Sequence, residues 1–194
     1  GSYNSNLLRF TLRYLAEKKP ESVDIITVGK KVKDYLTRRN VEIMDSETGI
    51  FQSFNYSLSS EFADKLVDNY LDSDYAEVNL LYNEFKNAAQ TTIKVERLLP
   101  LSREGKKSHL DYIYEPGVKE MLEILLPKYL KVRVHKMLLE ANASEQGLRM
   151  SSMDQANKNA RDMIKDLTLV YNKARQSSIT RELADLVGGA EAVV

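Results

Sequence analysis

The sequence predicts an α/β protein in which an open sheet with helices on its faces is followed by one very long C-terminal helix. Two observations predict it. Up to Gly117, short β-branched runs alternate with helical patterns. From Lys128 to Val187 the chain has no proline and a single glycine, and its apolar residues recur at helical spacing. We therefore predict an α/β domain over residues 1–117 and, over 118–194, the helix with a lead-in turn and an apolar tip.

The first part of the α/β domain is predicted as alternating helices and strands. Ser and Asn residues supply helix caps, Pro20 ends the first helix, and β-branched residues mark the strands. The expected elements are a helix from Asn4 or Ser5 to Lys18, a strand at 23–28, a basic helix at 30–39, a strand at 41–44, a turn at 45–49, and a helix from Ser59 or Ser60 to Leu71.

From Tyr75 onward the pattern changes to strands. Segments 76–86, 91–101 and 109–114 are rich in β-branched and aromatic residues and are separated by polar loops. Residues 118–126 are then predicted as a short helical lead-in, and Pro127 marks a kink before the long helix begins.

The long helix carries an apolar stripe with small residues between larger ones. Sixty helical residues reach ~90 Å at ~1.5 Å per residue, which the rest of the chain cannot cover. Small side chains let another helix approach closely, so the stripe is typical of a coiled-coil seam. The predicted seam consists of Met153, Ala156, Ala160, Ile164, Leu167, Tyr171 and Ala174.

A second apolar face lies at the tip of the helix. Ile179, Leu183, Leu186 and Val187 are rotated by roughly a third of a turn from the seam at ~100° per residue, so one flat groove cannot bury both faces. Between the faces lies the polar tract YNKARQSSIT, residues 171–180. It is either an ordinary exposed helix face or a set of contacts that engages a surrounding surface.

Composition excludes several classes of function. The chain has 28 basic and 28 acidic side chains, which argues against a long-range attraction to nucleic acid or anionic lipid. It has no cysteine, so disulfides, thiolate metal sites and a Cys nucleophile are excluded. No apolar run approaches the ~18 residues of a membrane span, so we expect membrane association only through partners, with no nucleic-acid partner and no direct bilayer insertion.

Candidate catalytic and metal-binding patterns are weak. No P-loop and no dinucleotide-binding glycine motif follows a predicted strand. His109 and His135 each lack further ligands at zinc spacing, so we interpret them as surface or interface side chains. Asp162 and Asp166 stand four residues apart, but Arg161 and Lys165 beside them indicate a mixed-charge helix face.

Several motifs resemble the gamma subunit of the rotary F-type ATP synthase. They are YNSN at 3–6, LYNEFKNA at 81–88, DYIYEP at 111–116, ASEQGLRM at 143–150, MDQANKNA at 153–160, LTLVYNKARQSSI at 167–179, and GGA at 188–190. The resemblance implies a Rossmann-like domain and a C-terminal helix that forms half of an antiparallel coiled coil. In that family a long N-terminal helix precedes the position of Gly1, and this missing helix is the partner we expect for the seam.

The resemblance also implies a function. The chain would be the central rotor shaft that couples ion-driven rotation of a membrane ring to nucleotide-affinity changes in the catalytic beta subunits, without a cofactor or catalytic residues of its own. Its partners would be the alpha and beta subunits, an epsilon-type subunit and the membrane ring. No plant-type cysteine insertion is present. The implied location is therefore the cytoplasmic face of the bacterial inner membrane, or the matrix face of the mitochondrial one.

Site residues follow from the resemblance position by position. The family's contacts with the beta subunits correspond to Arg175, Gln176, Thr180 and Glu182, and the apolar bearing around the tip corresponds to Ile179, Leu183, Leu186 and Val187. The contacts with the epsilon subunit and ring correspond to Tyr112, Tyr114 and Glu115. Two alternatives stay open: an α/β adaptor whose helical arm anchors it to another assembly, and a small α/β enzyme.

Overall fold

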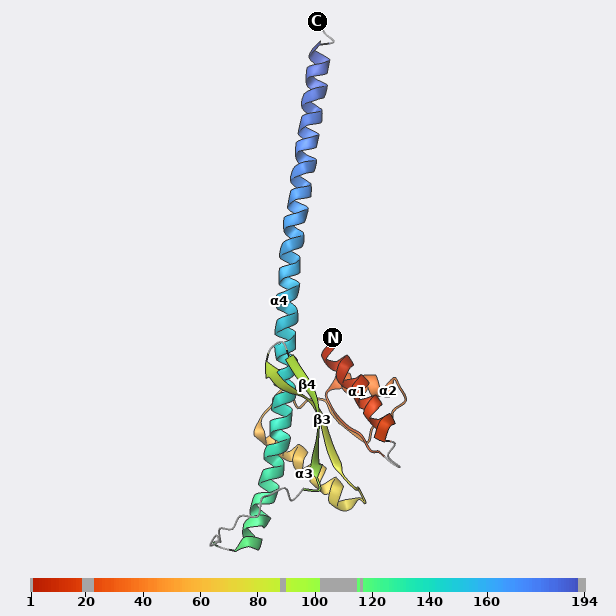
Figure 1. Ribbon diagram of the computed structural model, residues 1–194, viewed down its shortest axis with the longest axis vertical. Helices are drawn as coiled ribbons and strands as arrows, with labels where there is room; N and C mark the ends of the chain where they lie inside the picture. The colour runs from red at the N-terminus through yellow and green to blue at the C-terminus, as the bar shows by residue number, and fades with distance from the viewer. Residues whose placement is uncertain (1, 19–22, 88–89, 102–114, 116, 192–194) are drawn as a thin grey trace. The chain divides into compact units, whose positions relative to one another are not determined.

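The computed structural model describes residues 2–18, 23–87, 90–101, 115 and 117–191 (Figure 1). The α/β class and the long C-terminal helix that the sequence predicts are both present. The elements are α1 (Ser2–Lys18), β1 (Ile26–Val28), α2 (Lys30–Thr37), β2 (Asp45–Glu47), α3 (Tyr56–Asp72), β3 (Val78–Asn87), β4 (Gln90–Leu99) and α4 (Val118–Glu191).

The described strands pair two by two. β1 and β2 are parallel, with Ile26 opposite Asp45, and α2 connects them. β3 and β4 form an antiparallel hairpin in which Leu81 lies opposite Val95. Parallel neighbours require a crossover, which α2 supplies, whereas antiparallel neighbours can be joined by a short turn. The α/β unit is therefore a small βαβ motif followed by a hairpin.

One predicted strand is wrong. Residues 41–44 are irregular, and β2 occupies residues 45–47, where we expected a turn. The sequence Asp-Ser-Glu has little strand propensity, but its backbone pairs with β1, and Gly29 N–H donates to Glu47 O at 2.7 Å. Tertiary pairing overrides local propensity here. The strand expected at 109–114 lies outside the described residues.

Two helix starts also differ from the prediction. α1 already includes Ser2, ahead of the expected caps Asn4 and Ser5. α3 is capped by Asn55, whose side chain accepts the Leu58 N–H at 2.9 Å, and so begins before Ser59 and Ser60. Asn is as good a cap as Ser, and the earlier cap lets α3 include one more turn.

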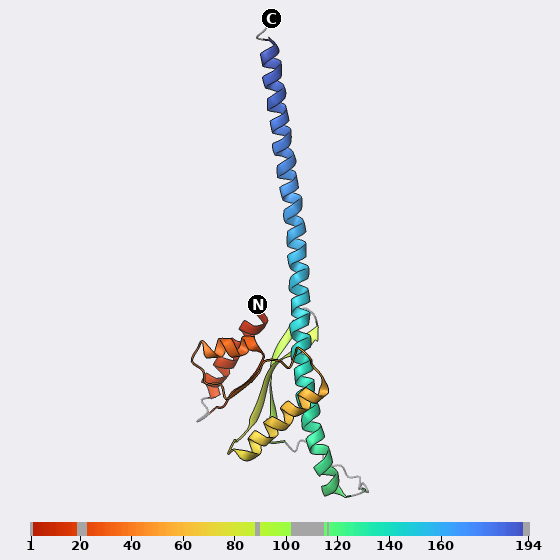
Figure 2. The same ribbon diagram turned by 180° about the vertical axis from the view of Figure 1, so that it is seen from behind.

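The core lies where α3, the β3–β4 hairpin and the first part of α4 meet (Figure 2). Its fully buried residues are 0–9% exposed. They are Ile50, Phe62, Ala63, Leu66, Leu80, Tyr82, Leu98, Leu99, Leu130, Val134, Met137 and Leu138. Burying a Leu-sized side chain contributes ~1.5–3 kcal/mol, so this cluster is the main source of stability for the α/β unit.

α4 is one continuous helix of 74 residues. Pro127 lies inside it on an exposed side, so the predicted lead-in at 118–126 is the start of the same helix. The proline costs the helix one N–H donor but no buried contact. By packing, the chain forms two units, Gly1–Leu148 and Arg149–Val194, which divide within α4. The predicted boundary at residue 117 instead separates the α/β elements from the long helix, and so does not coincide with the division by packing.

Candidate functional site: the exposed faces of the long helix

The seam predicted in α4 is uncovered along the whole of the second unit. Met153, Ile164, Leu167 and Tyr171 are 57–66% exposed, and the three alanines of the seam are exposed as well. A helix in a single soluble domain normally turns such a stripe toward a core. Contiguous exposed apolar surface is typical of an interaction site, so this stripe is a candidate docking face for another helix.

The second face, at the tip, is equally open. Its four large side chains are 48–70% exposed. They are Ile179, Leu183, Leu186 and Val187. At ~100° per residue this face stands about a third of a turn away from the seam, as the sequence predicts, because α4 runs unbroken through both. The two faces therefore point in different directions around one helix axis.

The polar residues between the faces have no tertiary contact in the described part of the chain. Arg175, Gln176 and Glu182 are exposed. Thr180 Oγ1 donates to the Gln176 carbonyl at 2.8 Å, one turn earlier. This bond uses the hydroxyl proton, so Thr180 presents only acceptor lone pairs to a partner in this geometry. The structure thus places all four residues at the helix surface without assigning them a partner.

Local contacts stabilise the exposed helix. Gln155 Nε2 donates to Asn159 Oδ1 at 2.8 Å, and Lys165 pairs with Asp162 at 3.7 Å. Pairs three or four residues apart contribute only ~0.2–0.5 kcal/mol each. The Asp162–Lys165 pair also agrees with a mixed-charge face rather than an acid–base pair of carboxylates.

Of the three residues expected to contact the epsilon subunit and the ring, one is described. Glu115 is exposed in a bend just before α4. Tyr112 and Tyr114 lie outside the described residues, as does His109. Among the predicted site residues that the structure describes, none contacts a second element.

Sequence reasoning missed a charged network in the first unit. Arg133 of α4 donates from Nε to Glu96 Oε1 at 3.0 Å, and Nη2 bonds both Glu96 and the Arg97 carbonyl. Glu96 also accepts from Tyr82 Oη at 2.8 Å, and Lys94 pairs with Glu84 at 2.8 Å. The sequence pattern could have predicted this network. Tyr82 and Glu84 are two residues apart on one strand, as are Lys94 and Glu96 on the paired strand, so all four lie on one face of the hairpin.

The network shifts the pKa of its members. Burial, together with the Glu96 carboxylate, raises the pKa of Tyr82 to about 12. Burial alone would raise the pKa of Glu96, but the hydrogen bonds from Arg133 and Tyr82 outweigh it and lower that pKa. The hydrogen bond to Glu84 raises the pKa of Lys94. All these groups keep their ordinary charges near neutral pH, so the network acts by attraction and not by proton transfer.

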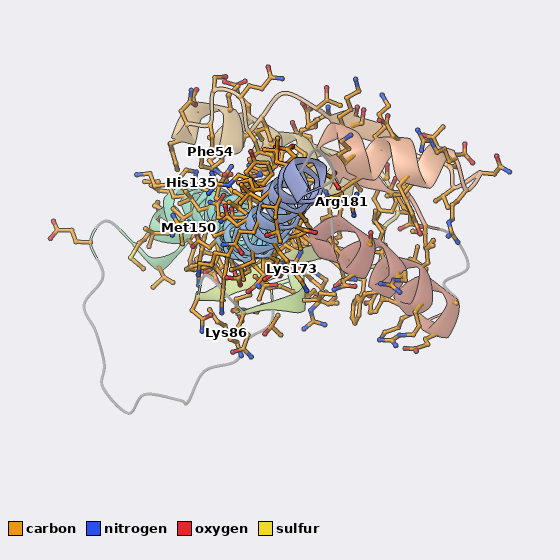
Figure 3. The ribbon with its side chains drawn as sticks, turned by 90° about the horizontal axis from the view of Figure 1, so that it is seen from above. Phe54, Lys86, His135, Met150, Lys173 and Arg181 are labelled. Atoms are coloured by element: carbon orange, nitrogen blue, oxygen red, sulfur yellow. The ribbon has the colours of Figure 1, made fainter. Side chains whose placement is uncertain are left out.

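His135 is half-buried in the first unit and is not a surface residue. Figure 3 labels His135 and Phe54, whose rings stack with centroids 5.2 Å apart. The His135 ring also meets the edge of Tyr56 at 5.4 Å. Nδ1 lies 2.9 Å from Ser59 Oγ, which itself donates to the Asn55 carbonyl at 2.9 Å. Because the serine proton is used there, Nδ1 of His135 is the donor. The side chain therefore joins α4 to α3.

One recess in the described part of the chain was considered as a possible ligand site. A shallow recess of about 580 Å³ in the first unit is lined by polar side chains, among them Lys18, Glu77 and Arg97. Within the described residues, no group of three or more His, Asp or Glu side chains could hold a metal ion. No described helix has an apolar stretch long enough to cross a bilayer.

Comparison with known proteins finds similarity to ATP synthase subunits. A family model described as ATP synthase matches residues 1–193. The chain is 45% identical over 194 residues to an ATP synthase gamma chain of Moorella thermoacetica, covering 100% of this chain and 68% of the relative. It is 40% identical over 201 residues to an ATP synthase gamma chain of Syntrophus aciditrophicus, covering 100% and 69%. The chain thus spans about two thirds of these relatives.

Solved structures agree with this likeness. A chain in the central stalk and c-ring structure of the Tetrahymena thermophila mitochondrial ATP synthase matches with a TM-score of 0.64 and 27% identity, covering 81% of this chain and 70% of that one. A chain of the Euglena gracilis mitochondrial ATP synthase, in an OSCP, F1 and c-ring structure, matches with a TM-score of 0.66 over 100% and 68%; at 20% identity it shows the fold alone.

Proposed function

The chain belongs to the family of ATP synthase gamma chains, the central-stalk subunits of the rotary ATP synthase, and from this premise we propose how its exposed helix couples rotation to catalysis. The proposed role is a mechanical one. A membrane ring turns the shaft, and the shaft changes the nucleotide affinities of the beta subunits. The chain makes no bond in ATP itself.

One observation carries this proposal: the two apolar faces of α4 are uncovered and point in different directions. The seam fits a second helix, which we propose to be the chain's own N-terminal helix, known here only from the family resemblance. The tip fits an enclosing collar. Each half-exposed Leu-sized side chain still has ~1 kcal/mol to gain from burial, so several of them on each face make binding favourable.

We propose the following contacts. The alpha and beta subunits enclose the tip residues and receive the polar side chains beside and below them, namely Arg175, Gln176, Thr180 and Glu182. Such polar contacts fix the angular register of the shaft more than its affinity. Tyr112, Tyr114 and Glu115 contact the epsilon-type subunit and the ring. The Thr180 hydroxyl, already donating within the helix, accepts a hydrogen bond from its partner.

Coupling follows from asymmetry. A shaft with apolar faces on two sides presents a different surface to each of three surrounding beta subunits. A rotation shifts a binding equilibrium only when the contacts differ between the states that it connects. The angular offset between seam and tip supplies that difference, because turning the shaft exchanges which subunit meets which face.

We also propose a location and a type. The assembly lies at the cytoplasmic face of the bacterial inner membrane, or at the matrix face of the mitochondrial one. The bacterial relatives at 45% and 40% identity support the former. The adaptor alternative predicts another assembly in place of the alpha and beta subunits.

The experiment starts from the complete subunit assembled in the whole ATP synthase, membrane ring included, in sealed membrane vesicles. We expect Arg175→Ala and Gln176→Ala to reduce ATP-driven proton pumping several-fold, while the circular dichroism of the purified subunit stays unchanged. Arg161→Ala is the matched control, because Arg161 lies about four turns below Arg175 on the same helix. If neither site variant changes coupling, these residues do not contact the hexamer. If alpha and beta subunits do not co-purify with the unaltered subunit, the result favours the alternative of an α/β adaptor.

A further inference from the structure

The first unit holds α4 along residues 130–144, and the contacts form an ordered pattern around the helix. Five apolar residues line the side that packs into the core: Leu130, Val134, Met137, Leu138 and Ala141. Apolar packing is not directional, so this strip alone resists removal of the helix better than it resists rotation about the helix axis.

Polar side chains of α4 flank that strip on the hairpin side. Arg133 binds Glu96 of β4. Glu140 accepts the Phe85 N–H of β3 at 2.8 Å. Ser144, which is fully buried, donates to the Asn83 carbonyl of β3 at 2.8 Å. At ~100° per residue these three residues of α4 fall within an arc of about 40°. We call them the hairpin row.

A second set of polar side chains flanks the strip on the α3 side. Lys131 pairs with Asp64 at 2.8 Å, and His135 donates to Ser59 Oγ at 2.9 Å. Both partners belong to α3. Lys131 and His135 also fall within about 40° of one another, and they stand about half a turn from the hairpin row at ~100° per residue. We call them the α3 row.

We propose that these two rows are the torque joint of the rotor, at which the α/β unit grips the shaft against rotation about its own axis. This inference rests on the proposed rotary function. Side-chain tips lie ~5–6 Å from a helix axis, so a turn of ~20° moves each tip by ~2 Å. A displacement of that size breaks a hydrogen bond of 2.8–3.0 Å. Because the rows lie on opposite sides, rotation in either direction disrupts both.

The two rows make different types of hydrogen bond, so their contributions to torque can be measured separately. The hairpin row includes a guanidinium that donates from both Nε and Nη2 to one carboxylate oxygen, together with bonds to the β3 backbone, whereas the α3 row consists of side-chain pairs. Charge-assisted bonds with two donors are stronger and more directional than single ones. The hairpin row therefore carries the larger share of the torque.

The test is single-molecule rotation of the complete subunit in the α and β hexamer, with the bead attached to the α/β unit so that torque must cross the joint. We expect Arg133→Gln to lower the stall torque at least two-fold while unloaded ATP hydrolysis stays within two-fold of the unaltered complex. Lys131→Met lowers it less, and the double variant lowers it most. Lys165→Met, in the second unit, is the matched control with no effect.

A covalent crosslink between α3 and α4 provides a second test that does not depend on the folding of a single variant. The chain has no cysteine of its own, so Asp64→Cys with Lys131→Cys, in a complex whose other cysteines are replaced, accepts a short bismaleimide between α3 and α4. In the Arg133→Gln background this bridge restores the stall torque. Unchanged stall torque in both single variants and the double variant overturns the proposal, as does a bridge that restores nothing. Absence of rotation in the unaltered complex would instead reject the rotary function itself.

Discussion

Residues 130–148 and 149–191 belong to the same helix, but the two parts meet opposite environments. In the first part, Val134 and Leu138 are buried by α3 and the β3–β4 hairpin. In the second, residues of the same chemical type lie exposed along the whole seam and tip. Helical periodicity is equally regular in both. The difference teaches that an apolar stripe defines a binding face, while the rest of the chain decides whether that face is already occupied.

The largest expected effect contrasts two leucines of α4. Leu138 is 1% exposed and Leu167 is 61% exposed. Leu138→Ala leaves a cavity in the core, and we expect it to lower the free energy of unfolding of the α/β unit by ~2–5 kcal/mol. We expect Leu167→Ala to change the free energy of unfolding of the isolated chain by no more than ~0.5 kcal/mol, because this exposed side chain has no tertiary contact to lose. Denaturant unfolding of both variants measures the difference. Equal losses of unfolding free energy would show that the two leucines do not differ in packing.

The pH dependence of the packed part is the next largest effect. The pKa of Tyr82 is about 12 in the folded chain against an ordinary 10.0. Between these values the unfolded chain has lost the phenol proton and the folded chain still holds it, so stability falls as pH rises from 10 to 12. The loss amounts to at most ~3 kcal/mol. Tyr82→Phe should flatten this alkaline slope in unfolding experiments, and a slope that survives would assign it to another group.

Self-association of the isolated chain tests whether the exposed seam is a binding face. We expect the isolated chain to associate through the seam, and Ile164→Lys to weaken that association about ten-fold, since burying an unpaired ammonium in an apolar contact is costly. Gln155→Lys adds the same charge away from the seam and serves as the control. Sedimentation velocity over a range of concentrations measures both. A chain that stays monomeric throughout would contradict the role of the seam.

The smallest effect compares two ion pairs. Lys131 pairs with Asp64 across two helices, and Lys165 pairs with Asp162 within α4 at 3.7 Å. We expect Lys131→Met to cost up to ~1 kcal/mol of unfolding free energy and Lys165→Met nothing measurable, because exposed pairs are screened by solvent. Thermal unfolding at low and high salt distinguishes them, since only the first should depend on salt.

Local rules account for what the sequence predicted well. The long helix was predicted correctly because helical periodicity depends only on spacing along the chain. The apolar residues assigned to the seam and the tip lie exposed on it, and their roles as contact faces stay predictions. The hairpin was also placed, with β3 and β4 within a few residues of prediction. The proposed contacts of Arg175, Gln176 and Glu182 stay predictions, since their partners are other polypeptides.

The order of an α/β domain followed by a long amphipathic helix could be predicted from the sequence alone, because propensity and periodicity are properties of neighbouring residues. Long-range packing, in contrast, makes Asp45–Glu47 a strand and lets Arg133 and His135 hold the helix to the hairpin and to α3. Those contacts join residues 37 and 76 positions apart. No pattern within a short window encodes which distant side chains meet, since their pairing depends on the packing of the whole unit.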